Sequence, residues 1–185
     1  SGDYRIWAAD AQGVQEVYPF VGSPGEINLY IEATVEDSTD GKGTPSATII
    51  SNVEDVVNLD PDTTKNINDR GRLPLNVYQV NYLPITPLNV NVTIIGYTGN
   101  ISEAQTALIA AFKEYFTTVR PYVAGADETD KSNLSAQRLI GVATTALPGE
   151  YNFSGLTMTV AGAPQTIYRF ENGNIPSINT VTVTA

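Results

Sequence analysis

Closely spaced carboxylates are the side chains of this sequence that could perform acid–base chemistry. We consider four pairs among them: Asp37 with Asp40, Glu54 with Asp55, Asp60 with Asp62, and Asp127 with Glu128. A glycoside hydrolase needs two carboxyl groups about 5 to 10 Å apart, one of which has a raised pKa. All four pairs fall in polar segments or on the surface of an expected helix, where acidic side chains are normally solvated. We therefore expect none of them to be catalytic.

The sequence gives even less support to a metal site, a nucleotide site or a catalytic nucleophile than to a pair of catalytic carboxylates. The run 37–41 has a slight likeness to a calcium-binding loop, but it lacks the alternating oxygen ligands and the closing glutamate. The chain has no His and no Cys, which excludes zinc sites built on them, Ser-His-Asp triads, cysteine nucleophiles and disulfides. It has no glycine-rich phosphate-binding motif. We predict no catalytic, metal-binding or cofactor-binding residue, no cofactor and no enzymatic activity.

Charge and hydropathy narrow the class of partner. The 185 residues include ten Lys and Arg against twenty Asp and Glu, a net charge of −10. Such a surface repels phosphates, so we exclude nucleic acid as a partner. The longest apolar runs, such as residues 90–95, are too short to cross a bilayer, and we expect no signal peptide at the start. We expect partner proteins rather than membranes or small-molecule substrates.

Tyrosine is enriched, with ten residues against a single Trp. Four of these tyrosines lie in expected strands: Tyr18, Tyr30, Tyr78 and Tyr82. Half of each ring can lie in a core while its hydroxyl reaches water, and this is the interpretation we favour. The alternative is a protein–protein interface, where tyrosine is enriched and charge is depleted.

The first part of the chain predicts an α+β unit of order α-β-β-α-β. Its elements are helix 3–11, strands 14–21 and 27–35, helix 45–58 and strand 75–83. The two strands alternate apolar and polar residues around the turn at 22–25, which favours an antiparallel hairpin. Thr44 followed by Pro45 is typical of a helix start. We expect polar loops at 36–43 and 60–71.

The second part predicts a unit of order β-α-α-β-β-β. Its elements are strand 88–94, helices 102–119 and 133–147, and strands 156–160, 166–171 and 178–184. Ser102 and Gln105 have the spacing of a capping box, and Pro121 follows the end of the first helix. Turns are expected at 162–164 and 173–176. In both units we expect helices on one face of a mostly antiparallel sheet, an α+β architecture.

The boundary between the units is expected at the segment bracketed by Pro84 and Pro87. Proline restricts φ and removes a ladder donor, which suits a semi-rigid joint. We therefore assign residues 1–86 to a first domain and residues 87–185 to a second. We also hypothesise that this joint is a hinge between two rigid lobes.

These elements carry short motifs that resemble the baseplate J-like family, the wedge proteins of Mu-type contractile phage tails. The opening matches are residues 2–8 (GDYRIWA), 13–14 (GV) and 17–19 (VYP), followed by 24–31 (PGEINLYI). Later matches are residues 45–46, 72–75, 120–121, 139–142 and 174–183. The resemblance spans essentially the whole chain. Family members carry a further N-terminal portion, so the chain resembles the C-terminal part of the family.

The resemblance implies a structural protein of a phage, prophage or phage-like baseplate that acts by protein–protein assembly. Its partners would be other baseplate wedge proteins and copies of itself. Its location would be the tail baseplate of the virion, and the bacterial cytoplasm during assembly. The family has no catalytic residues, so none are transferred. The loops 36–43 and 60–71 are longer and more polar than the family pattern, and we expect the segment 122–133 to be an insertion.

Two other functions remain open from the residues. A tail-associated glycan hydrolase would need a cleft with paired carboxylates. A cell-surface adhesion or glycan-binding module would account for the many Tyr and Asn residues, although the single Trp limits the stacking surfaces that such modules use. No motif supports either one.

Overall fold

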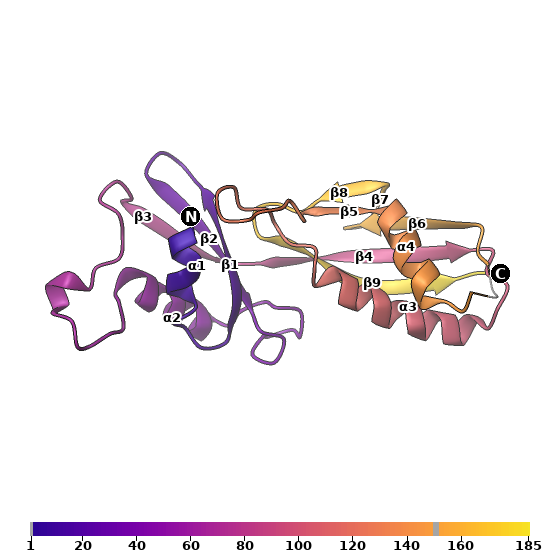
Figure 1. Ribbon diagram of the computed structural model, residues 1–185, viewed down its shortest axis with the longest axis horizontal. Coiled ribbons are helices and arrows are strands. Elements are labelled where there is room, and N and C mark those ends of the chain that lie inside the picture. The colour runs from indigo at the N-terminus through magenta and orange to yellow at the C-terminus, as the bar shows by residue number, and fades with distance from the viewer. Residues whose placement is uncertain (1, 150–151) are drawn as a thin grey trace. The chain divides into compact units, whose positions relative to one another are not determined.

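The computed structural model describes residues 2–149 and 152–185 and contains two compact units (Figure 1). Unit 1 comprises Ser1–Thr86 and Tyr122–Thr129, and unit 2 comprises Pro87–Pro121 and Asp130–Ala185. Helices accompany small β-sheets in the fold, which confirms the predicted α+β class.

Unit 1 is built on a three-stranded sheet of order β1-β2-β3. The strands are β1 (Val14–Val21), β2 (Glu26–Ala33) and β3 (Gln79–Pro84). β1 and β2 form the expected antiparallel hairpin, with Val17 opposite Ile31. β3 pairs parallel with β2, because a helix and a long loop carry the chain back to the starting end of β2 before β3 begins. The sheet of unit 1 is therefore mixed rather than mostly antiparallel.

Helices α1 (Gly2–Ala8) and α2 (Ala47–Asn58) pack with one face of this sheet. The buried core between them consists of Tyr4, Ala8, Ala11, Val17, Leu29, Ile31, Ala33, Ile49, Val53 and Val57. α2 begins later than expected, because its N-cap is Ser46, whose hydroxyl accepts from the Ile49 N–H at 3.3 Å. The predicted cap, Thr44, instead donates its hydroxyl to Asp40 at 2.7 Å.

The long connection from α2 to β3 contains one short 3-10 helix, η1 (Ile67–Asp69). β3 begins at Gln79 rather than at residue 75, because Pro74 starts a turn in which the Val77 N–H donates to its carbonyl at 3.0 Å. Only Ile85 separates β3 from the next strand, and its N–H donates to the Ile31 carbonyl at 3.0 Å. The expected joint at 84–87 is therefore nearly continuous extended chain.

Unit 2 contains a four-stranded sheet of order β7-β6-β4-β9 and a small pair, β5 with β8. The strands are β4 (Thr86–Ile95), β5 (Asn133–Ser135), β6 (Gly155–Val160), β7 (Ala163–Gln165), β8 (Ile167–Arg169) and β9 (Asn174–Val183). β9 starts inside the turn that we expected at 173–176. Of the predicted strand 166–171, only the part Ile167–Arg169 is a strand, β8. β7 starts inside the turn that we expected at 162–164.

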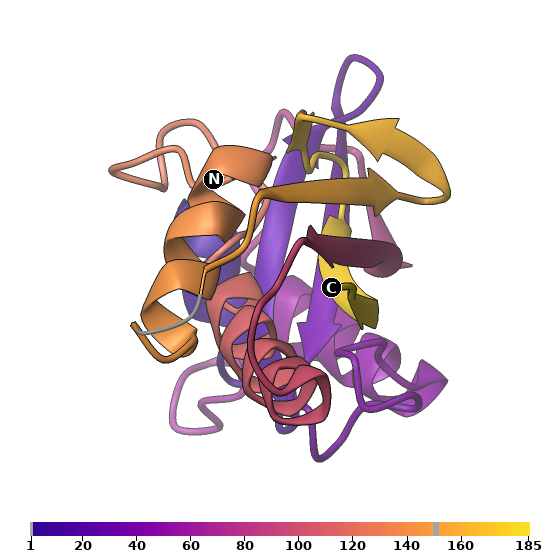
Figure 2. The ribbon, with the colours of Figure 1, turned by 90° about the vertical axis from the view of Figure 1, so that its right-hand side faces the viewer.

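Helices α3 (Ile101–Phe116) and α4 (Ala136–Ala146) lie on the same side of the unit 2 strands (Figure 2). The buried core includes Val90, Val92, Ile94, Leu108, Phe112, Leu134, Leu139, Met158 and Phe170. The N-cap of α3 is Asn100, which accepts from the N–H groups of Ser102 and Glu103, so the predicted capping box at Ser102 is wrong. The start of the second predicted helix forms β5 instead, because it pairs with β8.

The segment 122–129 belongs to unit 1, although the sequence-based division assigned it to the second domain. Arg5 of α1 holds it through two bonds to Asp127, from Nη1 to Oδ1 at 2.5 Å and from Nη2 to Oδ2 at 3.3 Å. Asp127 Oδ2 also accepts the Val123 N–H at 2.6 Å, which closes the segment on itself. A bidentate contact between residues 122 positions apart leaves no periodic signal in the sequence.

This contact generates a first prediction, for the variant Asp127→Ala. A hydrogen bond to a charged group contributes about 1.5–3 kcal/mol, so amide exchange at Val123 should accelerate by about tenfold or more. The measurement is amide hydrogen exchange by NMR. Glu128→Ala is the matched control, since Glu128 is exposed and carries the same charge. Equal exchange at Val123 in the two variants would contradict the role of Asp127.

Candidate interaction surfaces

The carboxylates that could have formed a hydrolase site are occupied by local contacts. In the 36–43 loop, Asp40 accepts the Thr44 hydroxyl and the N–H groups of Lys42 and Thr44. Burial acts to raise the pKa of Asp40, but these hydrogen bonds outweigh it and hold the pKa below its ordinary value. A general acid needs a raised pKa, so this shift opposes such a role.

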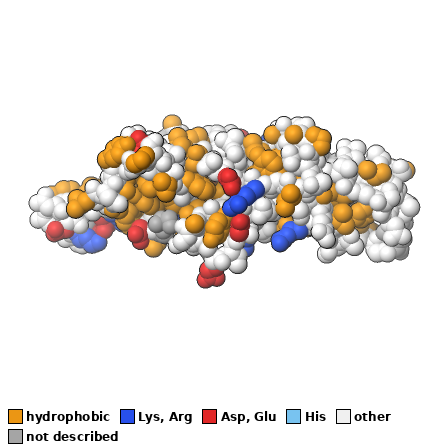
Figure 3. Space-filling model, turned by 90° about the horizontal axis from the view of Figure 1, so that it is seen from above, with side chains coloured by type: hydrophobic (Ala, Val, Ile, Leu, Met, Phe, Trp, Pro, Cys, Tyr) orange, Lys and Arg blue, Asp and Glu red, His pale blue; other side chains and the backbone are white. Residues whose placement is uncertain are grey.

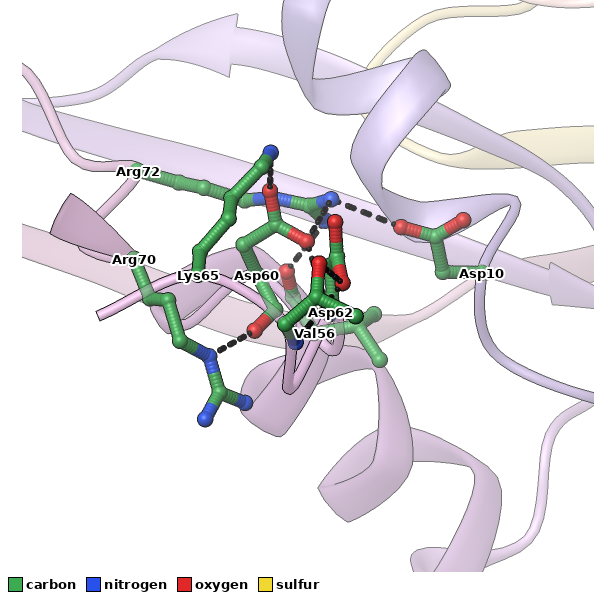
Figure 4. Close-up of polar contacts among 8 residues, drawn as sticks. Asp10, Val56, Asp60, Asp62, Lys65, Arg70 and Arg72 are labelled. Carbon is green, nitrogen blue, oxygen red and sulfur yellow. Dashed lines mark hydrogen bonds and ion pairs between the residues drawn. The ribbon is translucent and has the colours of Figure 1, made fainter. Parts of the chain in front are cut away.

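Arg72 organises the acidic loop that follows α2 (Figure 4). Its guanidinium donates from Nη1 to the Val56 carbonyl at 2.7 Å and from Nη2 to Asp10 Oδ2 at 2.8 Å. The same Nη2 lies 3.4 Å from Asp60 Oδ1. One largely buried cation therefore joins the helix α2, the turn after α1 and the start of the loop.

Asp60 is the second anchor of this loop. Its Oδ2 accepts Lys65 Nζ at 2.6 Å, its Oδ1 accepts the Asp62 N–H at 2.9 Å, and its carbonyl accepts Arg70 Nε at 2.6 Å. The hydrogen bond from Lys65 is the main reason that the pKa of Asp60 lies below its usual range. The Thr64 hydroxyl lowers the pKa of Asp62 in the same way. This pair therefore serves to fold the loop.

The remaining predicted carboxylates are also dispersed. Glu54 and Asp55 are exposed on α2, Glu128 is exposed, and Asp127 is bound to Arg5. Asp37 accepts the Thr34 hydroxyl at 3.0 Å. Within residues 2–149 and 152–185, no three His, Cys, Asp or Glu side chains gather where they could hold a metal ion.

A buried polar pair, Tyr18 with Glu32, was missed by the sequence reasoning. Both side chains are buried, and the Tyr18 hydroxyl donates to Glu32 Oε2 across the β1–β2 hairpin. Simple alternation placed Glu32 on a solvated strand face. It is covered because Gly43, at φ +95°, crosses so closely that a Cβ there would lie 3.1 Å from the Glu32 side chain. The positive φ favours glycine at this crossing.

The excess of negative charge lies entirely in unit 1. Unit 1 holds five basic and fifteen acidic residues, a net charge of −10, whereas unit 2 holds five of each and is neutral. The chain therefore has one strongly acidic unit and one unit with no net charge. Only the acidic unit would attract basic surfaces over a distance.

A stretch of 30 residues, 73–102, contains no charged side chain, and it includes β3 and β4. Apolar side chains of this stretch are exposed in each unit: Leu75 and Tyr78 before β3 in unit 1, and, separately, Ile95 and Ile101 in unit 2. Hydrophobic side chains gather over unit 1 on the face seen in Figure 3. The charged side chains visible on this face are scattered and form no large patch. Depleted charge with exposed apolar and aromatic groups is typical of the central part of a protein interface.

The second face of the unit 1 sheet, opposite α1 and α2, is also apolar in part. β1, β2 and β3 each contribute one half-buried apolar or aromatic side chain to this face, namely Phe20, Tyr30 and Leu83. The Phe20 and Tyr30 rings meet edge to face, with centroids 6.0 Å apart. Asn81 of β3 donates to Asn28 of β2 at 2.9 Å on the same face.

The four strand-region tyrosines divide between the two interpretations. Tyr82 is half-buried with its hydroxyl donating to Asn58, which fits the core interpretation. Tyr18 also lies in the interior, but its hydroxyl donates to the buried Glu32 instead of reaching water. Burial, with a smaller effect of Glu54, raises the pKa of Tyr82. Tyr78 is 69% exposed and donates its hydroxyl to Glu26 at 3.0 Å, which fits an interface.

No protein-family model matches the chain, and no curated protein matches it in sequence. Among the helices of the described residues, none has the length and apolar character needed to span a membrane.

The Asp60 contacts predict that Asp60→Asn loosens the loop. Losing the Lys65 ion pair should expose the loop to trypsin, so cleavage after Lys65 and Arg70 should quicken by roughly fivefold or more. The measurement is limited proteolysis with mass-spectrometric mapping. Asp69→Asn is the matched control, because Asp69 is an exposed residue of the same loop. Unchanged cleavage in Asp60→Asn would show that Asp60 does not hold the loop.

The pKa of Asp60 predicts the pH at which these contacts fail. Because the folded pKa is lowered, the contacts stabilise the loop above the ordinary value of 3.8 and are lost as pH falls through the folded pKa. Carboxyl carbon NMR should give an Asp60 midpoint below 3.8. Lys65→Met should move that midpoint upward, and Lys42→Met, on another loop, should not. A midpoint insensitive to Lys65→Met would refute the assignment of Lys65 as the main cause.

Proposed function

We propose that this chain is a structural component of a contractile phage, prophage or phage-like tail baseplate that acts by protein–protein assembly. The motifs that resemble the baseplate J-like family support the particular assembly. The proposed partners are other baseplate wedge proteins and further copies of the chain. The proposed location is the tail baseplate, with assembly in the bacterial cytoplasm.

The observation that carries the assembly role is the uncharged stretch 73–102. In a chain whose charged residues number 30 of 185, it exposes Leu75 and Tyr78 beside a strand at the edge of a sheet. When a partner removes exposed apolar side chains of this kind from water, the free energy of the system falls, and this favours binding.

The positions of the motif residues also support the proposal. In the opening motif, Tyr4 is buried, and its ring meets that of Trp7 edge to face at a centroid distance of 5.3 Å. The motif 17–19 lies on β1, and Leu139 of the motif 139–142 lies in the core of unit 2. The motifs therefore fall at places that build the two units, as expected when a resemblance reflects a shared scaffold.

The test is the composition of tail particles purified from the bacterium that encodes this chain. Mass spectrometry should detect the chain in intact contractile tails, and antibody labelling seen by electron microscopy should mark the baseplate end. Absence from pure particles would overturn the baseplate role. Hydrolysis of purified cell wall by the chain would instead support the glycan hydrolase, and selective binding on a glycan array the adhesion module.

A further inference from the structure

The strand edges of this protein are unequally protected. An edge strand presents unpaired backbone N–H and C=O groups, which proteins normally block with charges, prolines, short strands or covering groups. On β1, Arg5 Nε donates to the Val17 carbonyl at 3.1 Å and Glu16 accepts the Val17 N–H at 3.1 Å. Pro19 of the same strand has no N–H to offer. The β1 edge is therefore closed.

Both edges of the large unit 2 sheet also carry protective features. β7 is only three residues long and contains Pro164. On β9, the Val181 carbonyl accepts Nε2 of Gln105, a residue of α3, at 2.6 Å, and α3 packs against this strand. An added strand would meet a short, proline-containing edge on one side and an occupied acceptor on the other.

The β3 edge has none of these features apart from Pro84, its final residue. β3 is six residues long, and its sequence QVNYLP contains no charge. Its backbone pairs with β2 alone, and no side chain in the described part of the molecule forms a hydrogen bond with it. The apolar Leu75 and Tyr78 stand exposed just before it.

Two acidic side chains lie near β3, one on the neighbouring strand β2 and one on α2. Glu26 is directly opposite Gln79 in the sheet register, and Glu54 of α2 lies close enough to Tyr82 to contribute to its raised pKa. Among the residues that the structure describes, neither carboxylate forms an ion pair with Lys or Arg. The surrounding unit has a net charge of −10.

We propose that the outer edge of β3 receives an extended, basic segment of another protein, which adds to the unit 1 sheet as a fourth strand. Main-chain hydrogen bonds to β3 supply the pairing, and Lys or Arg side chains of the segment meet Glu26 and Glu54. A second copy of this chain is a poor occupant, because it would place like charges together. This inference deepens the proposed assembly role and rests on it.

The direct test uses the whole chain and a labelled synthetic peptide, Lys-Val-Lys-Val-Thr-Val-Lys-Val-Lys, followed by fluorescence anisotropy. The peptide should bind, and amide NMR shifts should concentrate in residues Gln79–Leu83. The comparison peptide Lys-Val-Lys-Pro-Thr-Pro-Lys-Val-Lys has the same charge but cannot form a strand ladder. Equal affinity for the two peptides would mean unspecific attraction to the acidic unit, and would overturn the proposal.

Two variants locate the contact. Gln79→Lys should weaken binding of the first peptide by about tenfold, because it places a positive charge on the edge. Gln15→Lys is the matched control, since it makes the same change on the closed β1 edge of the same unit, and it should leave the affinity within about twofold. Glu54→Gln tests the charge contact on a helix surface and should weaken binding without altering the strand. Equal effects of Gln79→Lys and Gln15→Lys would refute the β3 edge.

Sedimentation of the free chain tests the competing occupant. A dimer abolished by Gln79→Lys but not by Gln15→Lys would assign the edge to a second copy and contradict the proposal. The test is separate from that of the baseplate role. If the chain is found in tails but does not bind the strand-forming peptide, only the edge inference is refuted. If it binds the peptide but is absent from tails, only the baseplate role is refuted.

Discussion

Every strand at the border of a sheet must satisfy backbone groups that have no neighbour in the sheet, and this constraint underlies the account of this protein. Three of the four borders in its two main sheets are short, proline-containing or bonded by a side chain such as Arg5 or Gln105. β3, by contrast, is six residues long and uncharged, has its one proline at the final position, and receives no side-chain hydrogen bond on its backbone from the described residues. Water can satisfy these groups, but a partner strand can do so while also covering Leu75 and Tyr78.

The distribution of charge determines which kind of partner this edge would attract. The whole excess of negative charge lies in unit 1, yet within that unit the 73–86 segment carries none. An approaching basic partner would be attracted to the unit as a whole, while the contact itself would be dominated by main-chain pairing and apolar burial. Many other acidic groups have structural roles instead: Asp40 and Asp60 fold their loops, and Asp127 attaches a distant segment to α1.

Local patterns were sufficient to predict the elements whose structure depends on periodicity. The alternation in 14–21 and 27–35 predicted the hairpin, and the helix expected over 102–119 before Pro121 corresponds to α3. Long-range pairing was not predictable: the parallel partner of β3 and the return of 122–129 to unit 1 depend on contacts between distant residues. Neither the buried pair of Tyr18 with Glu32 nor the Arg72 cluster leaves a spacing signal, so both emerged only from the fold. The uncharged stretch 73–102 can be read from the sequence, but the position of β3 at the edge of its sheet cannot.

Hydrogen exchange of the chain inside purified tail particles, compared with the isolated chain, tests the central claim most directly. If a partner strand occupies β3, the backbone amides of Gln79–Leu83 should exchange more slowly in the particle, while those of β1, already closed by Arg5 and Glu16, should change little. Exchange at β3 that is identical in the free and assembled chain, with protection gained elsewhere, would contradict the account.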